Sequence, residues 1–336
     1  MVTQAEIARK LGVSRQLVTF ALSGYPQISR KSRERILAAA EEMGYCPNPY
    51  ARALKSGRSG IIGLWIPDQI STHYTHVARE LNRLVKAAKH ELIISEVSIA
   101  EAQQILSHVP MDGIIVVDAP DQAKIYQKSA MASRVPIICI GADGIEKCDT
   151  VQVDLYAGTL EAMKHLIGSG FRRIAHATFV REDSRRATRR MGYLKAMREA
   201  KLEPEFIYYP LTEQQRMVTR QLIQDYIREH GRPDAIFCHS DDVALGIYRG
   251  LCDIKLRMPE DVALVGCDGI QDTQYLECQL TTLVQPVAEM CGTAWQFLSQ
   301  RMDQSAGKSQ RRTLKPKLVI RDSSAAQRPL EIAAKG

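Results

Sequence analysis

The chain has 336 residues, which is enough for two or three domains that each bury a core of their own. Its composition, 45% hydrophobic and 25% charged residues, is typical of a globular protein, and no apolar run approaches the roughly 20 residues of a membrane-spanning helix. The opening residues, MVTQAEIARKLG, lack the apolar core of a secretory signal. We therefore expect a cytoplasmic protein that does not associate with a membrane.

The net charge of +7 is concentrated at one end of the chain. Residues 1–60 hold ten cations against four acids, a local excess of +6, whereas the remaining residues are almost balanced. Such an asymmetry is typical of a module that binds a polyanion such as nucleic acid. A merely solvated surface is the alternative, and charge alone does not decide between the two.

The first 45 residues carry the end signals of three short helices. Thr3 and Glu6 form a capping box, and Gly12 ends the first helix within a short turn. Ser14 is placed to cap a second helix, and Ser29 a third that ends near Gly44. A helix, a tight turn with glycine, a second helix and a supporting helix predict a helix-turn-helix module. The alternative is a three-helix bundle with a structural role only.

In a helix-turn-helix module, the first turns of the second helix face base edges in the major groove. Here these positions hold Arg15, Gln16 and Thr19, followed by Phe20. Arg can pair with guanine and Gln with adenine, each discriminating by about 1–3 kcal/mol, although a phosphate contact or plain solvation is the alternative for each side chain. Phe20 has no hydrogen bond to offer. It packs either on a thymine methyl group or on the module's own core.

The segment after the third predicted helix begins another, very short one. Asn48 is a suitable N-cap with Pro49 at the first helical position, and the helix ends at the stretch 56–60, which is rich in glycine and serine. Two turns of helix are marginal without a partner surface. A plain linker is the alternative.

These motifs together resemble the lac repressor family of bacterial transcription regulators. The matching runs are 5–8 (AEIA), 12–14 (GVS), 42–45 (EMGY), 47–48 (PN) and 51–54 (ARAL). The resemblance implies that the short helix is a hinge helix, which folds when two subunits meet on DNA and wedges Leu54 between base steps of the minor groove, accompanied by Ala51 and Lys55. The family commonly has an Arg where this chain has Phe20, so we expect a different operator half-site. The expected DNA-binding residues are Thr3, Ser14, Arg15, Gln16, Thr19, Phe20, Asn48, Ala51, Leu54 and Lys55.

From residue 60 onward, apolar strand-like runs alternate with helical patterns. A first series comprises strands at 61–66, 91–97, 113–117 and 136–140 with a helix at 78–88, and a second comprises strands at 173–177, 235–238 and 262–266. Near-continuous apolar strands separated by helices predict doubly wound parallel sheets covered on both faces. Two such series predict two α/β subdomains with a cleft between them, where ligands bind beyond the carboxyl ends of the strands.

The resemblance extends over this region, through the runs 111–115, 170–175, 241–246 and 280–286. It implies a body of the periplasmic-binding-protein type, in which the chain crosses between subdomains near 154–156, 285–286 and 315–317. The implied division is a DNA-binding domain at 1–46, a hinge at 47–59, an effector-binding and dimerisation domain at 60–324, and a flexible tail at 325–336. Within the body, the N-subdomain spans about 60–154 and 287–313, and the C-subdomain about 156–284 and 317–324.

The resemblance also implies a small effector site. Arg189 and Asp268 match the family's ligand-clamping Arg and hydroxyl-binding carboxylate, and such a pair suits vicinal hydroxyls, which both donate and accept. A structural ion pair is the alternative. Ser240 and Leu155 stand where Asn is frequent, which thins the polar pattern of a typical sugar pocket. The expected effector is a sugar or related metabolite, and a common hexose is not assumed. Plausible wall residues are His73, Tyr74, Phe179 and Gln285, whereas Trp65 and Trp295 are predicted to be core.

Nothing in the sequence predicts catalysis, a cofactor or a metal. None of the eight cysteines stands in a C-x-x-C pair, and Asp241 and Asp242 have no third ligand at metal spacing, so Asp241 is predicted to cap a helix. Cys139, Cys238 and Cys267 are predicted to be buried, and Cys46 and Cys148 are candidate exposed thiols in loops.

We therefore expect a regulator, rather than an enzyme, that binds a palindromic DNA operator as a homodimer, most simply as a repressor under the control of a small effector. Whether the effector releases or recruits the protein stays open. The alternative is a solute-binding protein of the periplasmic type with no role on DNA.

Overall fold

The computed structural model describes residues 2–45, 58–67, 71–96, 109–141, 145, 148–179, 188–212, 214–303 and 307–325. The chain forms two compact units, residues 1–59 and residues 60–336. We call the second unit the body, and each unit is described by itself.

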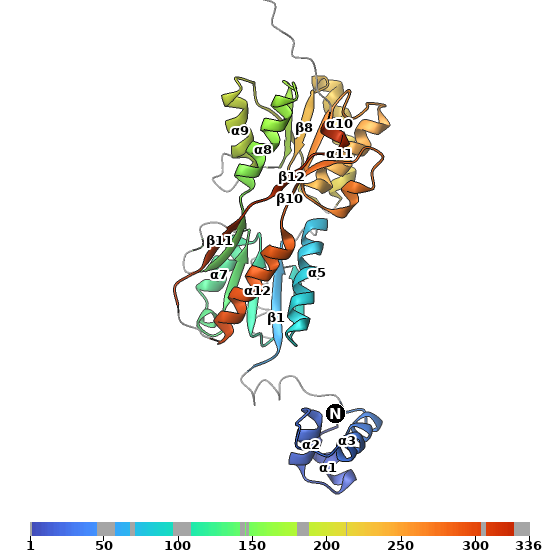
Figure 1. The fold of residues 1–336 in the computed structure, drawn as a ribbon, viewed down its shortest axis with the longest axis vertical. Coiled ribbons are helices and arrows are strands. Elements are labelled where there is room, and N and C mark those ends of the chain that lie inside the picture. Colours follow the sequence, from blue (N-terminus) through green and yellow to red (C-terminus); the bar gives the residue numbers. More distant parts are fainter. Residues whose placement is uncertain are drawn as a thin grey trace, which may run out of the picture. The chain divides into compact units, whose positions relative to one another are not determined.

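The first unit consists of the three predicted helices, drawn in blue in Figure 1: α1 (Gln4–Leu11), α2 (Arg15–Leu22) and α3 (Arg30–Glu42). The Thr3–Glu6 capping box is present, and Gly12 ends α1 with a left-handed φ of 66°. Ile7, Val18 and Ile36, one from each helix, are at most 1% exposed and form the core. The predicted helix-turn-helix module is confirmed.

The body contains two six-stranded sheets. The first has the strand order β11-β5-β4-β3-β1-β2, and all its paired strands run parallel. Its members are β1 (Ile61–Ile66), β2 (Glu91–Glu96), β3 (Gly113–Val117), β4 (Ile137–Ile140), β5 (Asp149–Val153) and β11 (Arg311–Leu314). Its helices are α5 (Thr72–Ala87), α7 (Pro120–Gln127) and α12 (Val287–Asp303). We call this sheet with its helices the first half.

Alternate side chains of the first sheet feed two separate cores. One core joins one face of β1 to α5 and α12, which lie side by side in Figure 1 although about 200 residues separate them in the sequence. The other core holds Trp65 and Tyr126 of α7, whose rings meet edge to face. Burial on both faces explains why the strands read as continuous apolar runs.

The second sheet repeats this order as β12-β10-β9-β8-β6-β7, and only β12 runs antiparallel to its neighbour β10. Its members are β6 (Ile174–Thr178), β7 (Glu205–Tyr208), β8 (Ala235–Cys238), β9 (Ala263–Asp268), β10 (Thr281–Val284) and β12 (Lys317–Val319). Helices α8 (Leu155–Gly168) and α9 (Thr188–Glu199) cover one face, and α10 (Gln215–His230) and α11 (Asp241–Asp253) cover the other. This sheet with its helices is the second half. The predicted α/β fold class is confirmed.

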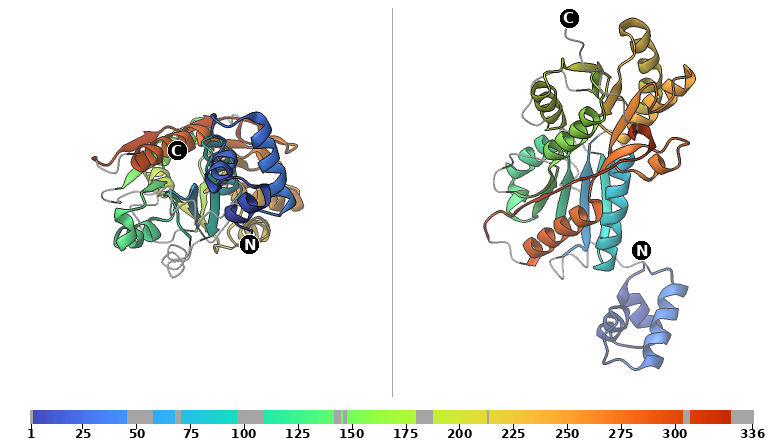
Figure 2. Two further views of the ribbon diagram at one scale, coloured as in Figure 1. Left: turned by 90° about the horizontal axis from the view of Figure 1, so that it is seen from below. Right: turned by 45° about the horizontal axis from the view of Figure 1, so that its top comes forward.

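The chain passes between the two halves three times. It leaves the first sheet after β5, returns after β10 to form α12, and leaves again between β11 and β12. The right-hand view of Figure 2 shows the last passage as a long orange-red ribbon. Each half is therefore built from segments that lie far apart in the sequence.

Several elements differ from the sequence prediction. Helix α5 begins at Thr72 rather than at residue 78, because Ser71 caps it by accepting a hydrogen bond from the Tyr74 N–H. Strands β5, β7, β10 and β11 were not predicted. Polar or charged residues interrupt or shorten the apolar run in each of them, and β11, with three exposed residues of four, lies at the edge of its sheet.

The cysteine predictions are mostly confirmed, with one correction. Cys139, Cys238 and Cys267 are fully buried as predicted. The prediction for Cys148 is wrong, because this side chain is 1% exposed and its Sγ lies 3.2 Å from the Sγ of Cys139. Cys46 lies outside the described residues.

Candidate functional site

The first turn of α2 presents two long polar side chains to solvent. Ser14 caps the helix by accepting a hydrogen bond from the Leu17 N–H at 3.1 Å, which fixes the direction in which the helix starts. Arg15 and Gln16 follow immediately, and both are exposed. Val18 and Ala21 anchor the opposite face in the core. The helix therefore offers a donor fork and an amide on a rigid support.

Two other predicted DNA-binding residues take part in bonds inside the module. The Thr3 N–H donates to Glu6 Oε2 at 2.7 Å, and this bond lowers the pKa of Glu6. The Thr19 hydroxyl donates to Gln4 Oε1 at 2.8 Å and so ties α2 to α1. Both residues therefore stabilise the module through these bonds, and their contact with DNA stays a prediction.

Phe20 does not pack on the module's apolar core, which was one of its two predicted alternatives; packing on a thymine methyl group stays a prediction. The Phe20 ring stacks on Tyr25, in the turn after α2, with 4.7 Å between the ring centroids and 15° between the planes. Neither ring belongs to the apolar core, and Tyr25 is 44% exposed. The two rings form a stacked aromatic pair at the C-terminal end of α2.

The predicted hinge residues Asn48, Ala51, Leu54 and Lys55 lie outside the described residues.

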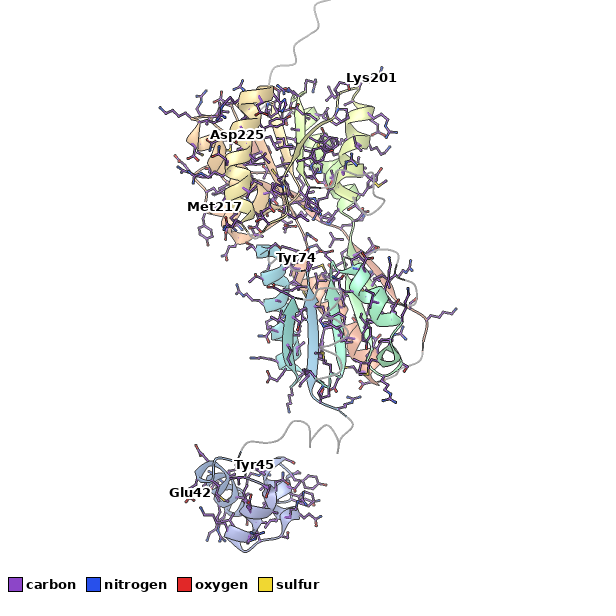
Figure 3. The ribbon with its side chains drawn as sticks, turned by 180° about the vertical axis from the view of Figure 1, so that it is seen from behind. Glu42, Tyr45, Tyr74, Lys201, Met217 and Asp225 are labelled. Carbon is purple, nitrogen blue, oxygen red and sulfur yellow. The ribbon has the colours of Figure 1, made fainter. Side chains whose placement is uncertain are left out.

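A second group of candidate functional side chains gathers where the two halves of the body meet, which is where Figure 3 places Tyr74. We call it the junction cluster. Its members are His73, Tyr74, Asp118, Arg189, His239, Cys267, Asp268 and Gln285.

Arg189 and Asp268 are brought together as the sequence predicted. The guanidinium of Arg189, on the first turn of α9, lies 3.7 Å from Asp268 Oδ1, at the end of β9. The Gln285 amide donates to the same oxygen at 2.8 Å. Burial raises the pKa of Asp268 to about 7, although Arg189 and Gln285 act in the opposite direction. At 3.7 Å the two side chains are not hydrogen-bonded to each other, so each keeps bonding capacity for a ligand hydroxyl group.

His239, which the sequence analysis missed, fixes Arg189 from another side. Its Nε2 lies 3.1 Å from the guanidinium, and because Arg can only donate, Nε2 must be the acceptor and the ring must be neutral. Burial, reinforced by the Arg189 charge, lowers the pKa of His239 well below its usual value. The predicted wall residue Phe179 packs edge-on against this imidazole, with 4.8 Å between the ring centroids.

The first half contributes His73, Tyr74 and Asp118. Burial lowers the pKa of His73 to about 4, so this ring is neutral at pH 7. The Tyr74 hydroxyl donates to Asp118 Oδ2 at 3.2 Å. Asp118, directly after β3, was also missed by the sequence analysis, and its position beyond the carboxyl end of a buried strand was the signal that could have identified it.

The acidic pair at the start of α11 has structural roles. The prediction that Asp241 caps this helix is wrong, because Ser240 is the cap and accepts a hydrogen bond from the Val243 N–H. Asp241 instead accepts bonds from the Gly269 and Ile270 N–H groups at 2.7 and 2.9 Å. Asp241 thereby fixes the backbone that directly follows Asp268 in the chain.

Asp242 joins the two halves of the body. Its carboxylate accepts bonds from the Thr72 N–H at 2.9 Å and the Thr72 hydroxyl at 2.8 Å, at the start of α5. A negative charge is favourable there because of the helix dipole. Arg216 donates to Asp242 and also to the Thr72 hydroxyl, which completes a three-residue bridge between α5, α10 and α11.

Within the described residues, no group of three His, Cys, Asp or Glu side chains is arranged to hold a metal ion. No helix in this part of the chain has the length and hydropathy needed to cross a membrane.

The fold and the two sites define a class of protein: a helix-turn-helix DNA-binding module joined to a two-sheet body with a polar cluster between its halves. Comparison with known proteins agrees. Residues 3–48 match the model of the bacterial regulatory proteins, lacI family, and residues 163–324 match the periplasmic binding protein-like domain.

Known relatives match over almost the whole length. The chain is 29% identical to the ribose operon repressor of Haemophilus influenzae over 333 residues, which covers 96% of this chain and 98% of the relative. It is 26% identical to catabolite control protein A of Priestia megaterium, covering 96% and 99%. The crystal structure of the lac repressor dimer bound to operator and the anti-inducer ONPF has the same fold, with a TM-score of 0.80, 22% identity and coverage of 97% and 99%.

The chain therefore belongs to the lacI family of bacterial regulatory proteins and is a DNA-binding transcription regulator.

Proposed function

We propose that this protein is a cytoplasmic repressor that binds a palindromic operator as a homodimer and is controlled by a sugar or related metabolite. The observation that carries the DNA-binding part is the first turn of α2, where Arg15 and Gln16 are exposed on a capped helix. Two such helices, related by the two-fold axis of a dimer, read half-sites about one helical turn apart.

The proposed division of the chain keeps a DNA-binding domain at 1–46, a hinge at 47–59 and an effector domain at 60–324, with a tail at 325–336. In this proposal the hinge folds on DNA, and Leu54 wedges between base steps with Ala51, Lys55 and Asn48 beside it. Unstacking a base step costs a few kcal/mol, which the added contacts of a widened minor groove offset.

The junction cluster is the proposed effector site, with Arg189 and Asp268 as the central pair and His73, Tyr74, Phe179, Ser240 and Gln285 around it. A sugar is supported by the relative named ribose operon repressor and by a solved regulator–cellobiose complex of the same fold. Ligand binding between the halves would change the relative orientation of the two N-subdomains across the dimer, and with it the distance between the hinge helices. A coupling of about 1–3 kcal/mol to DNA binding corresponds to roughly 5- to 150-fold control of operator affinity.

The proposed function is that of a regulator and not of an enzyme. This is supported by the acidic pair, because Asp241 and Asp242 accept hydrogen bonds from backbone N–H groups of the fold, and by Arg189 of the junction cluster, which faces Asp268. The second candidate function, solute binding without DNA regulation, is supported by the fold of the body alone.

Selection from a random duplex library, with and without a panel of sugars, tests the proposal. We expect one palindromic sequence to be enriched and one sugar to change its retention. Equal, weak retention of every duplex under all sugars would favour the solute-binding alternative.

Two variants test the DNA contacts. Arg15→Ala should relax selectivity at one base pair per half-site, whereas uniform weakening across sequences would make Arg15 a phosphate contact. Leu54→Ala should reduce specific affinity and spare non-specific binding, and an equal loss of both would contradict the wedge.

A third variant tests the effector site. Asp268→Ala should abolish the effect of the sugar on operator binding and leave operator affinity without sugar unchanged. An intact sugar response in this variant would show that the effector binds elsewhere.

A further inference from the structure

The two acids of the junction cluster stand on unusual backbone. Asp118 has a φ of 46° and Asp268 a φ of 124°, and each directly follows or ends a buried strand. The other non-glycine residues of the described chain with positive φ lie just after helices, where this conformation is common: Lys89, Lys201 and Lys255. Strained conformations persist where the surrounding structure enforces them, and they concentrate at functional sites. Asp118 shares this feature with the predicted ligand-binding Asp268.

Gly141 makes room for the Asp118 carboxylate. A Cβ atom on Gly141 would lie 1.9 Å from Asp118 Oδ1, and Gly141 itself has a φ of 75°. The carboxylate therefore occupies the space that a side chain at the end of β4 would fill. In the strand order, β4 holds the same place in the first sheet as β9 holds in the second, and Asp268 ends β9. Asp118 itself follows the neighbouring strand β3, but its carboxylate lies over the end of β4, so each half presents one carboxylate at this place in its sheet.

The charges of the junction cluster favour some ligands over others. His73 and His239 are neutral at pH 7, so Arg189 is the one cation of the cluster and faces two carboxylates. Asp118 is exposed to solvent, but the protein atoms around its carboxylate remove part of its hydration and so raise its pKa. Above its raised pKa, each of these acids is ionised; a carboxylate in this form accepts hydrogen bonds only and repels a second anion.

We propose that Asp118, seated over Gly141, is a specificity-determining residue of the effector site, and that with Asp268 it selects a hydroxylated ligand that is neutral or carries an amine and excludes a sugar acid. The ligand's donors then bind one carboxylate from each half. This inference rests on the proposed effector site and adds the charge class of its ligand.

Titration calorimetry with the full-length protein tests the inference, using D-ribose, cellobiose, D-glucosamine and D-glucuronate as probes. The variants are Asp118→Asn, Gly141→Ala and Asp268→Asn. The matched control is Asp121→Asn, which removes the same charge from an exposed position three residues away. Thermal unfolding of each variant checks that it is folded.

We expect at least one of the first three sugars to bind the wild-type protein, and D-glucuronate to bind more weakly than that sugar. Loss of a charge-assisted hydrogen bond should weaken binding about 10- to 100-fold in Asp118→Asn. Gly141→Ala should lose as much, because its Cβ displaces the carboxylate, and Asp121→Asn should change affinity less than twofold.

Three results would overturn the inference. If Asp268→Asn abolishes binding and Asp118→Asn keeps it, the effector site stands and only the role of Asp118 is wrong. If D-glucuronate binds most tightly of the four sugars, the claim that the site excludes sugar acids is refuted, and the effector site itself stands. If none of the four sugars binds the wild-type protein, both the inference and the proposed sugar-controlled function fail.

Discussion

A buried ion pair in the first half makes a sharp prediction about stability. Asp149, with a side chain 2% exposed, accepts two bonds from Arg301 at 2.7 and 2.8 Å and a third from the Gln310 N–H at 2.7 Å. Asp149→Ala leaves the largely buried guanidinium without its counter-charge. Breaking such a pair costs about 3–5 kcal/mol. With a denaturant slope near 2 kcal/mol per molar, the urea midpoint should fall by about 1.5–2.5 M.

Tryptophan fluorescence is the suitable assay because both tryptophans of the chain lie in the first half: Trp65 is buried in one core, and the half-buried Trp295 packs against the other. The control is Glu199→Gln, which breaks the exposed pair of Glu199 with Lys195 on α9. An exposed pair of this kind contributes about 0.5 kcal/mol or less. If Asp149→Ala shifts the fluorescence midpoint no more than the control does, the argument from burial is refuted.

Three further predictions concern the second half. Because burial raises the pKa of Asp268 to about 7, its contribution to stability is fully present below the unfolded value near 3.8 and is lost as the pH rises through 7. Between pH 5 and 8, the free energy of unfolding of Asp268→Asn should rise relative to that of the wild type as the pH increases. A difference that does not change with pH would contradict this. In urea titrations, Asp241→Ala should lower the free energy of unfolding by about 3 kcal/mol. Asp241→Asn can still accept the bonds from the Gly269 and Ile270 N–H groups, so it should lower the free energy of unfolding by less than half as much. Gly246→Ala should destabilise the protein by at least about 1–3 kcal/mol in thermal melts, since its Cβ would lie 2.4 Å from a backbone oxygen of α10, and an unchanged melting temperature would show that α10 and α11 can move apart freely.

The helix-turn-helix module was predictable almost residue by residue from the sequence. Its caps act over three residues, so Thr3, Ser14 and Ser29 mark the helix starts without any knowledge of the rest of the chain. The same locality explains the error at Asp241. Ser240 and Asp241 are adjacent residues that can both cap, and the choice depends on the amides of Gly269 and Ile270, which local sequence does not place.

The junction cluster was predictable only in part. Arg189 and Asp268 were identified through the family resemblance, whereas Asp118 and His239 were not. Their importance comes from contacts between distant segments: Asp118 with Tyr74 of α5, and His239 with Arg189 of α9. A single sequence does not reveal such pairs. The stacking of Phe20 on Tyr25 spans only five residues, yet it was missed because aromatic pairs in turns follow no fixed spacing.

The three passages of the chain between β5 and α8, β10 and α12, and β11 and β12 have a consequence for how the body responds to damage. A protease that cuts one passage leaves the other two as covalent links. The nicked molecule should therefore migrate as one species under native conditions and separate into fragments only after denaturation. For the same reason, neither half corresponds to a continuous gene segment, so expressing residues 60–154 alone would leave the first sheet without β11 and without the α12 cover of its core.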